Sequence, residues 1–115
     1  MEPAGEDAIC RRQNLDGHMI KHVVAFRFKA NVPEDERINL LAELNEFPKC
    51  FRSVKHWSLS ANISRRDDTF TRGFIVEFDT EDELLTYLGS EAHDRFVTKR
   101  FRPLIKRQAI ISLRV

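Results

Sequence analysis

The sequence predicts an α+β domain of the ferredoxin-like, split βαβ class, in which helices cover one face of a four-stranded antiparallel sheet. Segments rich in β-branched and aromatic residues alternate with helical patterns in the order strand, helix, strand, strand, broken helix, strand. The chain has 115 residues, which is enough for one domain with a real core. We therefore expect a single sheet-and-helix domain.

Residues 20–29 form the first expected strand, because apolar residues dominate them and β-branched and aromatic types lie at their centre. Alternate side chains of a strand point to the same face. One face, which we assign to the helix side, therefore carries His22, Val24, Phe26 and Phe28.

A helix is expected to begin near Pro33, because proline suits the first turn and the acidic residues after it interact favourably with the helix dipole. Pro48 should end this helix. Its apolar stripe consists of Leu40, Leu41, Leu44 and Phe47. Residues 53–63 and 70–78 are predicted to be the second and third strands, with a charged turn between them.

A broken helix follows the third strand. Thr80 and Glu83 have the spacing of a capping box, and Gly89 should end the first helical piece. Ser90 can cap the second piece. The inward face of that piece is expected to carry His93, Phe96, Val97, Phe101 and Leu104. Residues 109–115 are predicted to form the last strand.

A sheet with helices on one side leaves its other face uncovered. We expect this face to carry Val23, Ala25, Trp57 and Leu59. An apolar face of this size needs a partner, and the simplest partner is a second copy of the chain related by a two-fold axis. The sequence therefore predicts a homodimer.

Charge and composition exclude several classes of function. The formal net charge of +1 provides no overall attraction to nucleic acid or to acidic membranes, and no apolar run approaches the roughly 20 residues of a membrane helix. Cys10 and Cys50 fit no disulfide framework or metal motif, so we expect free thiols in a cytoplasmic protein. Residues 1–18 are polar and aperiodic, which predicts an N-terminal extension before a domain at 19–115.

His22, Tyr87 and His93 are the candidate site residues. With Ser90 as cap, His93 lies in the first turn of its helix, where the helix dipole and an apolar environment both favour neutral imidazole. A neutral imidazole can act as a general base. Tyr87 precedes the helix break and can donate a hydrogen bond to an oxyanion, while His22 supplies a third polar group from the first strand.

Other interpretations stay open. The three side chains can be half-buried aromatic residues that bond only to backbone groups. His22 and His93 can be metal ligands, but no further ligand has suitable spacing, so no metal is expected. The basic stretch 99–107 is expected to be a solvated helix face, or alternatively an anchor for a phosphate-bearing carrier such as coenzyme A.

Three segments resemble the stress-responsive dimeric α/β-barrel (Dabb) domain. They are residues 19–29 with Lys21-His22, residues 74–78, and residues 87–96, which run from Tyr87 to Ala-His-Asp-Arg-Phe. The resemblance covers about residues 19–115. It implies a ferredoxin-like fold that pairs into a dimeric α/β barrel.

Within that family the chain is similar to plant polyketide cyclases of the olivetolic acid cyclase type, which work without metal or cofactor. This similarity implies that His93 is the acid–base residue, Tyr87 an active-site tyrosine and His22 their support. It places the pocket wall at Val24, Phe26, Phe74, Leu88 and Phe96, with Leu104 where the cyclases have a bulky aromatic residue. Differences at Arg72, Phe74 and Leu104 leave the substrate open.

Three functions are therefore expected as alternatives. The first is a cofactor-independent polyketide cyclase or related acid–base enzyme. The second is a non-catalytic, stress-responsive dimer that binds a small apolar or polyketide-like ligand in the same pocket. The third is a cofactor-independent monooxygenase, in which the substrate itself activates oxygen. Oxygen consumption separates the third from the first, and turnover of a polyketide thioester separates the first from the second.

Overall fold

The computed structural model describes residues 19–115, so the predicted extension and Cys10 lie outside the described residues. Two short helical turns accompany the main elements, Phe47–Cys50 after the first helix and Arg102–Leu104 before the last strand. The main elements are β1 (Ile20–Phe28), α2 (Glu34–Glu46), β2 (His56–Ala61), β3 (Arg72–Phe78), α3 (Glu81–Leu88), α4 (Glu91–Phe96), a π-helical turn (Val97–Phe101) and β4 (Ile105–Arg114).

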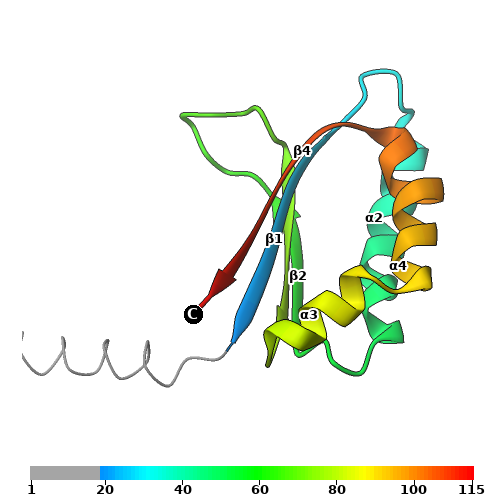
Figure 1. The fold of residues 1–115 in the computed structure, drawn as a ribbon. Coiled ribbons are helices and arrows are strands. Elements are labelled where there is room, and N and C mark those ends of the chain that lie inside the picture. Colours follow the sequence, from blue (N-terminus) through cyan, green and yellow to red (C-terminus); the bar gives the residue numbers. More distant parts are fainter. Residues whose placement is uncertain (1–18) are drawn as a thin grey trace, which may run out of the picture.

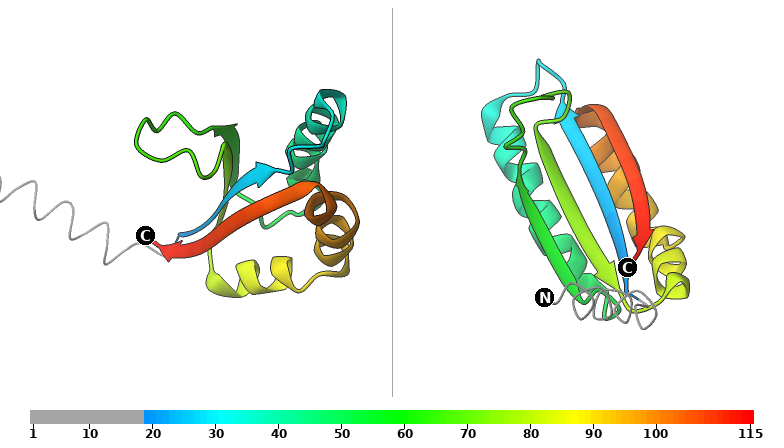
Figure 2. Two further views of the ribbon diagram at one scale, coloured as in Figure 1. Left: turned by 90° about the horizontal axis from the view of Figure 1, so that it is seen from above. Right: turned by 90° about the vertical axis from the view of Figure 1, so that its left-hand side faces the viewer.

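The four strands form one antiparallel sheet in the order β2-β3-β1-β4. Helices α2, α3 and α4 all lie on one side of it (Figure 1). Seen from the opposite side, the sheet has no helix of residues 19–115 in front of it (Figure 2). The predicted ferredoxin-like fold class and its element order are confirmed.

The core lies between the helices and the sheet because β1 alternates as predicted. His22, Val24, Phe26 and their neighbours on that face are buried, whereas the residues between them are partly exposed. Phe26 is fully buried and contacts the ring of Phe101 edge-on at 5.3 Å between centroids. Aromatic rings of this kind contribute both apolar area and specific edge-to-face contacts.

The helix boundaries follow from capping chemistry. The Thr80 hydroxyl accepts a hydrogen bond from the Glu83 amide, and the Glu83 carboxylate accepts one from the Thr80 amide, which completes the predicted capping box. Gly89 ends α3. Ser90 then caps α4 by accepting a hydrogen bond from the backbone amide of His93 at 3.1 Å.

The predicted bounds of several strands were wrong. The third strand begins at Arg72 rather than at residue 70. The second strand is shorter than residues 53–63 and comprises only β2. The last strand begins at Ile105 rather than at residue 109. Basic residues dominate its start, and they can enter a strand because backbone hydrogen bonds to β1 stabilise it there.

The predicted composition of the uncovered face was partly wrong. Trp57 and Leu59 pair with the buried residues Val76 and Phe74 of β3 and therefore lie on the helix side of the sheet. Alternation shows which residues share a face but not which face the helices cover. The uncovered face instead combines the correctly predicted Val23 and Ala25 with Ile75, Ile111 and Leu113.

No helix within residues 19–115 is both long enough and apolar enough to cross a membrane.

Candidate functional site

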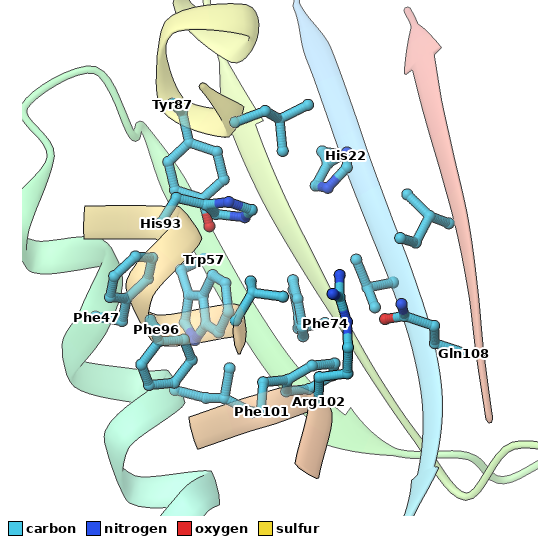
Figure 3. A pocket seen from close by; sticks show the side chains of 15 residues that line it. His22, Phe47, Trp57, Phe74, Tyr87, His93, Phe96, Phe101, Arg102 and Gln108 are labelled. Carbon is cyan, nitrogen blue, oxygen red and sulfur yellow. The ribbon is translucent and has the colours of Figure 1, made fainter. Parts of the chain in front are cut away.

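A cavity of about 220 Å³ lies between the sheet and the helices (Figure 3). Its polar lining residues come from β1, the α3–α4 region, the turn after the π-helical segment and β4. They are His22, Tyr87, His93, Arg102 and Gln108. The volume lies below the range of about 300–1,000 Å³ usual for drug-sized ligands, so a small molecule fits it.

The rest of the wall is apolar. Trp57 stacks on Phe74 at 4.7 Å between ring centroids, and its indole nitrogen donates a hydrogen bond to the Asn45 side chain at 2.8 Å. The aromatic lining residues are Phe47, Trp57, Phe74, Phe96 and Phe101, and the aliphatic ones are Val24, Leu44, Leu88, Val97 and Ile110. Such a wall excludes water and strengthens electrostatic interactions inside.

The structure brings His22, Tyr87 and His93 to one cavity, as predicted, together with four of the six predicted wall residues, Val24, Phe74, Leu88 and Phe96. Phe26 and Leu104 are not part of the lining. Phe26 lies deeper in the core, between Phe28, Phe74 and Phe101. Leu104 is partly buried and packs against the same core cluster.

Trp57, Arg102 and Gln108 also line the cavity, and the sequence did not indicate them as lining residues. Trp57 was assigned to the wrong face of the sheet. Gln108 was placed before the last strand, although it pairs with Phe26 within β4 and thus shares the helix side of the sheet. Gln108, Ile110 and Ser112 alternate along β4 and therefore share one face of the sheet. A strand that begins only at residue 109 leaves Gln108 outside this pattern.

Tyr87 and His93 meet because the chain turns sharply between α3 and α4. The Ser90 hydroxyl donates a hydrogen bond to the Tyr87 carbonyl at 2.9 Å and accepts one from the His93 amide, so one side chain fixes both residues. The ring centroids of Tyr87 and His93 are 4.8 Å apart, and the two rings meet edge to face. In Figure 3 the Tyr87 hydroxyl and the imidazole of His93 point into the cavity on the same side.

His22 faces this pair from β1 and is held from behind. Its Nδ1 and the Ser112 hydroxyl of β4 are joined by a hydrogen bond of 2.8 Å. The ring is 4% exposed, so its orientation is fixed by the sheet and by this bond. Nε2 is then free for a ligand oxygen, in the way that a second partner commonly orients a functional histidine.

Burial keeps all three groups neutral near pH 7. Burial lowers the pKa of His93, although the nearby Asp94 carboxylate partly opposes this effect. Burial and the proximity of His93 lower the pKa of His22. Burial also raises the pKa of the Tyr87 phenol, so that it stays a hydrogen-bond donor. The arrangement therefore offers a neutral base beside a protonated phenol.

The described part of the chain contains no group of three or more His, Cys, Asp or Glu residues that could hold a metal ion. Cys50 is a free, exposed thiol and does not line the cavity. The polar groups that line the cavity are imidazole, phenol, guanidinium and amide groups.

The basic stretch 99–107 does not act as one surface. Arg100 makes a bidentate ion pair with Glu43 of α2, with both contacts at 2.7 Å, and so ties the π-helical turn to that helix. Arg102, in contrast, lines the cavity. The turn before it is π-helical because the Arg102 amide donates to the Val97 carbonyl, and π turns often occur at functional sites.

The lowered pKa values of the two histidines predict acid sensitivity. Unfolded histidine titrates near pH 6.5, so below this pH the unfolded chain binds protons that folded His22 and His93 do not. The free energy of unfolding should fall as the pH decreases from about 6.5 to the folded pKa values. Urea unfolding between pH 5 and 8 measures this slope. His93→Gln should make the free energy of unfolding depend less steeply on pH. An unchanged pH dependence in that variant would contradict a lowered pKa of His93 in the folded protein.

A protein-family model described as the stress responsive A/B barrel domain (Dabb) matches residues 20–113. None of the curated proteins matches the chain in sequence. Among solved structures, a Dabb family protein with a ferredoxin-like fold from Mesorhizobium loti is 26% identical, with a TM-score of 0.75, and the match covers 83% of this chain and 94% of that one.

Two further structures share the fold at lower identity. The hydroxynitrile lyase of Passiflora edulis is 17% identical with a TM-score of 0.78, over 86% of this chain and 94% of that chain. A dimeric ferredoxin-like protein of unknown function from Thermobifida fusca is 17% identical with a TM-score of 0.73, over 87% and 93% of the two chains.

Proposed function

The chain belongs to the stress responsive A/B barrel (Dabb) family, and on this basis we propose that it is a cofactor-independent acid–base enzyme acting on a small apolar carbonyl compound. The observation that carries the proposal is the contact of the His93 ring with the Tyr87 ring, at 4.8 Å between centroids, inside a largely apolar cavity. The placement of a base beside a phenol donor is what proton abstraction next to a carbonyl requires.

The proposed reaction starts when neutral His93 takes a proton from a carbon activated by neighbouring carbonyl groups. The resulting carbanion attacks a second carbonyl of the same molecule, a carbon–carbon bond forms, and the carbonyl oxygen becomes an alkoxide. The Tyr87 hydroxyl donates a hydrogen bond to this oxygen. Protonated His93 then returns its proton to the alkoxide. This sequence is an aldol cyclisation and needs no redox partner.

His22 acts as a positioning residue in this scheme. Its bond to Ser112 fixes the ring, and its free nitrogen can orient one carbonyl of the substrate toward His93. A fixed geometry lowers the entropic part of the barrier. The hydroxynitrile lyase from Passiflora edulis has a similar fold. Cleavage of a cyanohydrin begins with removal of its hydroxyl proton, a step that a base and a donor placed in this way also suit.

We further propose that the functional unit is a homodimer of domains that span residues 19–115. The uncovered sheet face supports this proposal, because Ile111 and Leu113 are 49% and 43% exposed there in the single chain. Exposed apolar patches on sheets commonly mark protein interfaces. The similar protein from Thermobifida fusca is described as dimeric.

Turnover assays test the function. The protein is incubated separately with a linear polyketide thioester, which tests cyclisation, and with an aromatic cyanohydrin, which tests cleavage to aldehyde and cyanide, while dissolved oxygen is monitored. Product formation without oxygen consumption is expected from one of them. Oxygen consumption would support a monooxygenase instead. Binding of both compounds without turnover of either would support the non-catalytic ligand-binding dimer.

A further inference from the structure

Among residues 19–115, Arg102 is the one formally charged side chain that lines the cavity at neutral pH. The other polar lining residues are a phenol, an amide and two imidazoles, and no acidic residue of the described part of the chain lines the cavity. Burial lowers the pKa of both histidines, so neither carries a charge at pH 7. The positive charge of the exposed Arg102 therefore lies at the border of a largely apolar lining.

The ion pairs of residues 19–115 do not use Arg102. Its neighbours in the chain differ in this respect, since Arg100 is paired with Glu43 and Arg95 with Glu91. A guanidinium without a carboxylate partner at the border of an apolar cavity attracts an anionic group of a ligand. Its planar fork suits a carboxylate, which accepts two parallel hydrogen bonds.

Gln108 adds a second polar group at the same place. Arg102 and Gln108 border both this cavity and an adjoining hollow of similar volume, which Lys106 and Arg107 also line. In Figure 3 the guanidinium and the amide lie near each other, below His22 and the Tyr87–His93 pair. The apolar side chains of Val24 and Phe74 line the cavity together with these two groups. The lining thus has a group of two imidazoles and a phenol and, apart from it, a guanidinium beside an amide.

We propose that the cavity takes a small oxo acid, whose carboxylate binds Arg102 and Gln108 and whose carbonyl oxygen lies at Tyr87 and His93. The placement of the carbonyl rests on the proposed function, whereas the placement of the carboxylate does not. The apolar part of the molecule lies against Trp57 and Phe74. The natural substrate is then a carbonyl compound with a free carboxylate, and a neutral ketone of similar shape should still enter the cavity through contacts with its apolar wall.

Trp57 supplies the readout for a binding test, because it is the only tryptophan of the chain and lines the cavity. The probes are 4-phenylbutanoate and 4-phenylbutanamide, which have nearly the same shape and differ in charge. The variants are Arg102→Gln and, as the matched control, Lys99→Gln, which removes a nearby exposed cation that does not line the cavity.

Arg102→Gln should weaken 4-phenylbutanoate binding by roughly fivefold, the scale of a partly exposed ion pair. It should leave the amide unchanged, and Lys99→Gln should leave both unchanged. Equal weakening of both probes by Arg102→Gln, no weakening of either, or an equal effect of Lys99→Gln on the acid would overturn the proposal. Because the amide reports an intact cavity, a folding defect is recognised directly.

The same assay separates this proposal from the catalytic one. His93→Ala should keep the difference between acid and amide, since His93 does not contact the carboxylate in this arrangement. If no turnover is found with any substrate but the Arg102-dependent difference is present, the acid-binding site stands and the enzymatic function fails. If turnover is found but Arg102→Gln weakens the acid and the amide equally, the enzymatic function stands and the acid-binding site fails.

Discussion

Replacement of His93 by alanine should lower turnover by about 100-fold or more, the usual contribution of a general base. The half-buried His93 ring packs against Tyr87, and the capping bond from Ser90 uses the backbone amide rather than the imidazole, so the variant should stay folded. Initial rates at saturating and limiting substrate measure the loss. Tyr87→Phe should cost less, about tenfold, because it removes one hydrogen bond and keeps the ring.

His56→Ala is the matched control for this prediction. His56 lies exposed on the edge strand β2, on the face of the sheet away from the cavity, and should leave the rate unchanged. If His93→Ala retains full turnover, or if it loses rate only because it unfolds, the imidazole has a structural role and the enzymatic proposal is wrong. Circular dichroism and urea unfolding of each variant distinguish these cases.

Ile111→Glu should convert the proposed dimer to monomers. Val23, its partner across β1 and β4, lies on the same uncovered face, so a carboxylate at position 111 would be buried between the two sheets without a counter-charge. An unpaired charge in an interface is destabilising by several kcal/mol, about 3–5 in measured cases, and the two-fold axis introduces it twice. Light scattering coupled to size exclusion at micromolar concentration measures the mass.

Ile38→Glu is the matched control for the interface. Ile38 is 56% exposed on α2, on the helix side of the molecule, so the same charge there should leave the dimer intact. A wild-type monomer, or a dimer that survives Ile111→Glu, would contradict the proposed sheet-to-sheet interface. Loss of the dimer in both variants would show a general effect of added charge.

Local rules explain what could be predicted from the sequence. The alternation of β1 placed His22 on the buried face, and the capping residues Thr80 and Ser90 located the helix break that brings Tyr87 to His93. These features depend on residues a few positions apart. The resemblance of the same segments to Dabb domains then indicated the fold and the family, and both are confirmed.

The missed features depend on long-range packing. The prediction for Trp57 was wrong because strand alternation shows which side chains share a face of the sheet. It does not show which of the two faces the helices cover. The π-helical turn changes the helical period after Val97, so the regular spacing that placed Leu104 on the inward face did not reveal Arg102 at the cavity. Phe26 shares a face with His22 but is covered by Phe101, which only the packed structure shows.

The most direct test of the acid–base proposal measures proton transfer at carbon without knowledge of the natural substrate. The protein is mixed with 4-phenylbutan-2-one in heavy water, and nuclear magnetic resonance follows the exchange of the hydrogens beside the carbonyl. Wild type should accelerate the exchange above the buffer rate, His56→Ala should match wild type, and His93→Ala should return the rate to that of buffer. Equal exchange with wild type and with His93→Ala, while Trp57 fluorescence reports bound ketone, would contradict the proposal and leave the cavity a binding site.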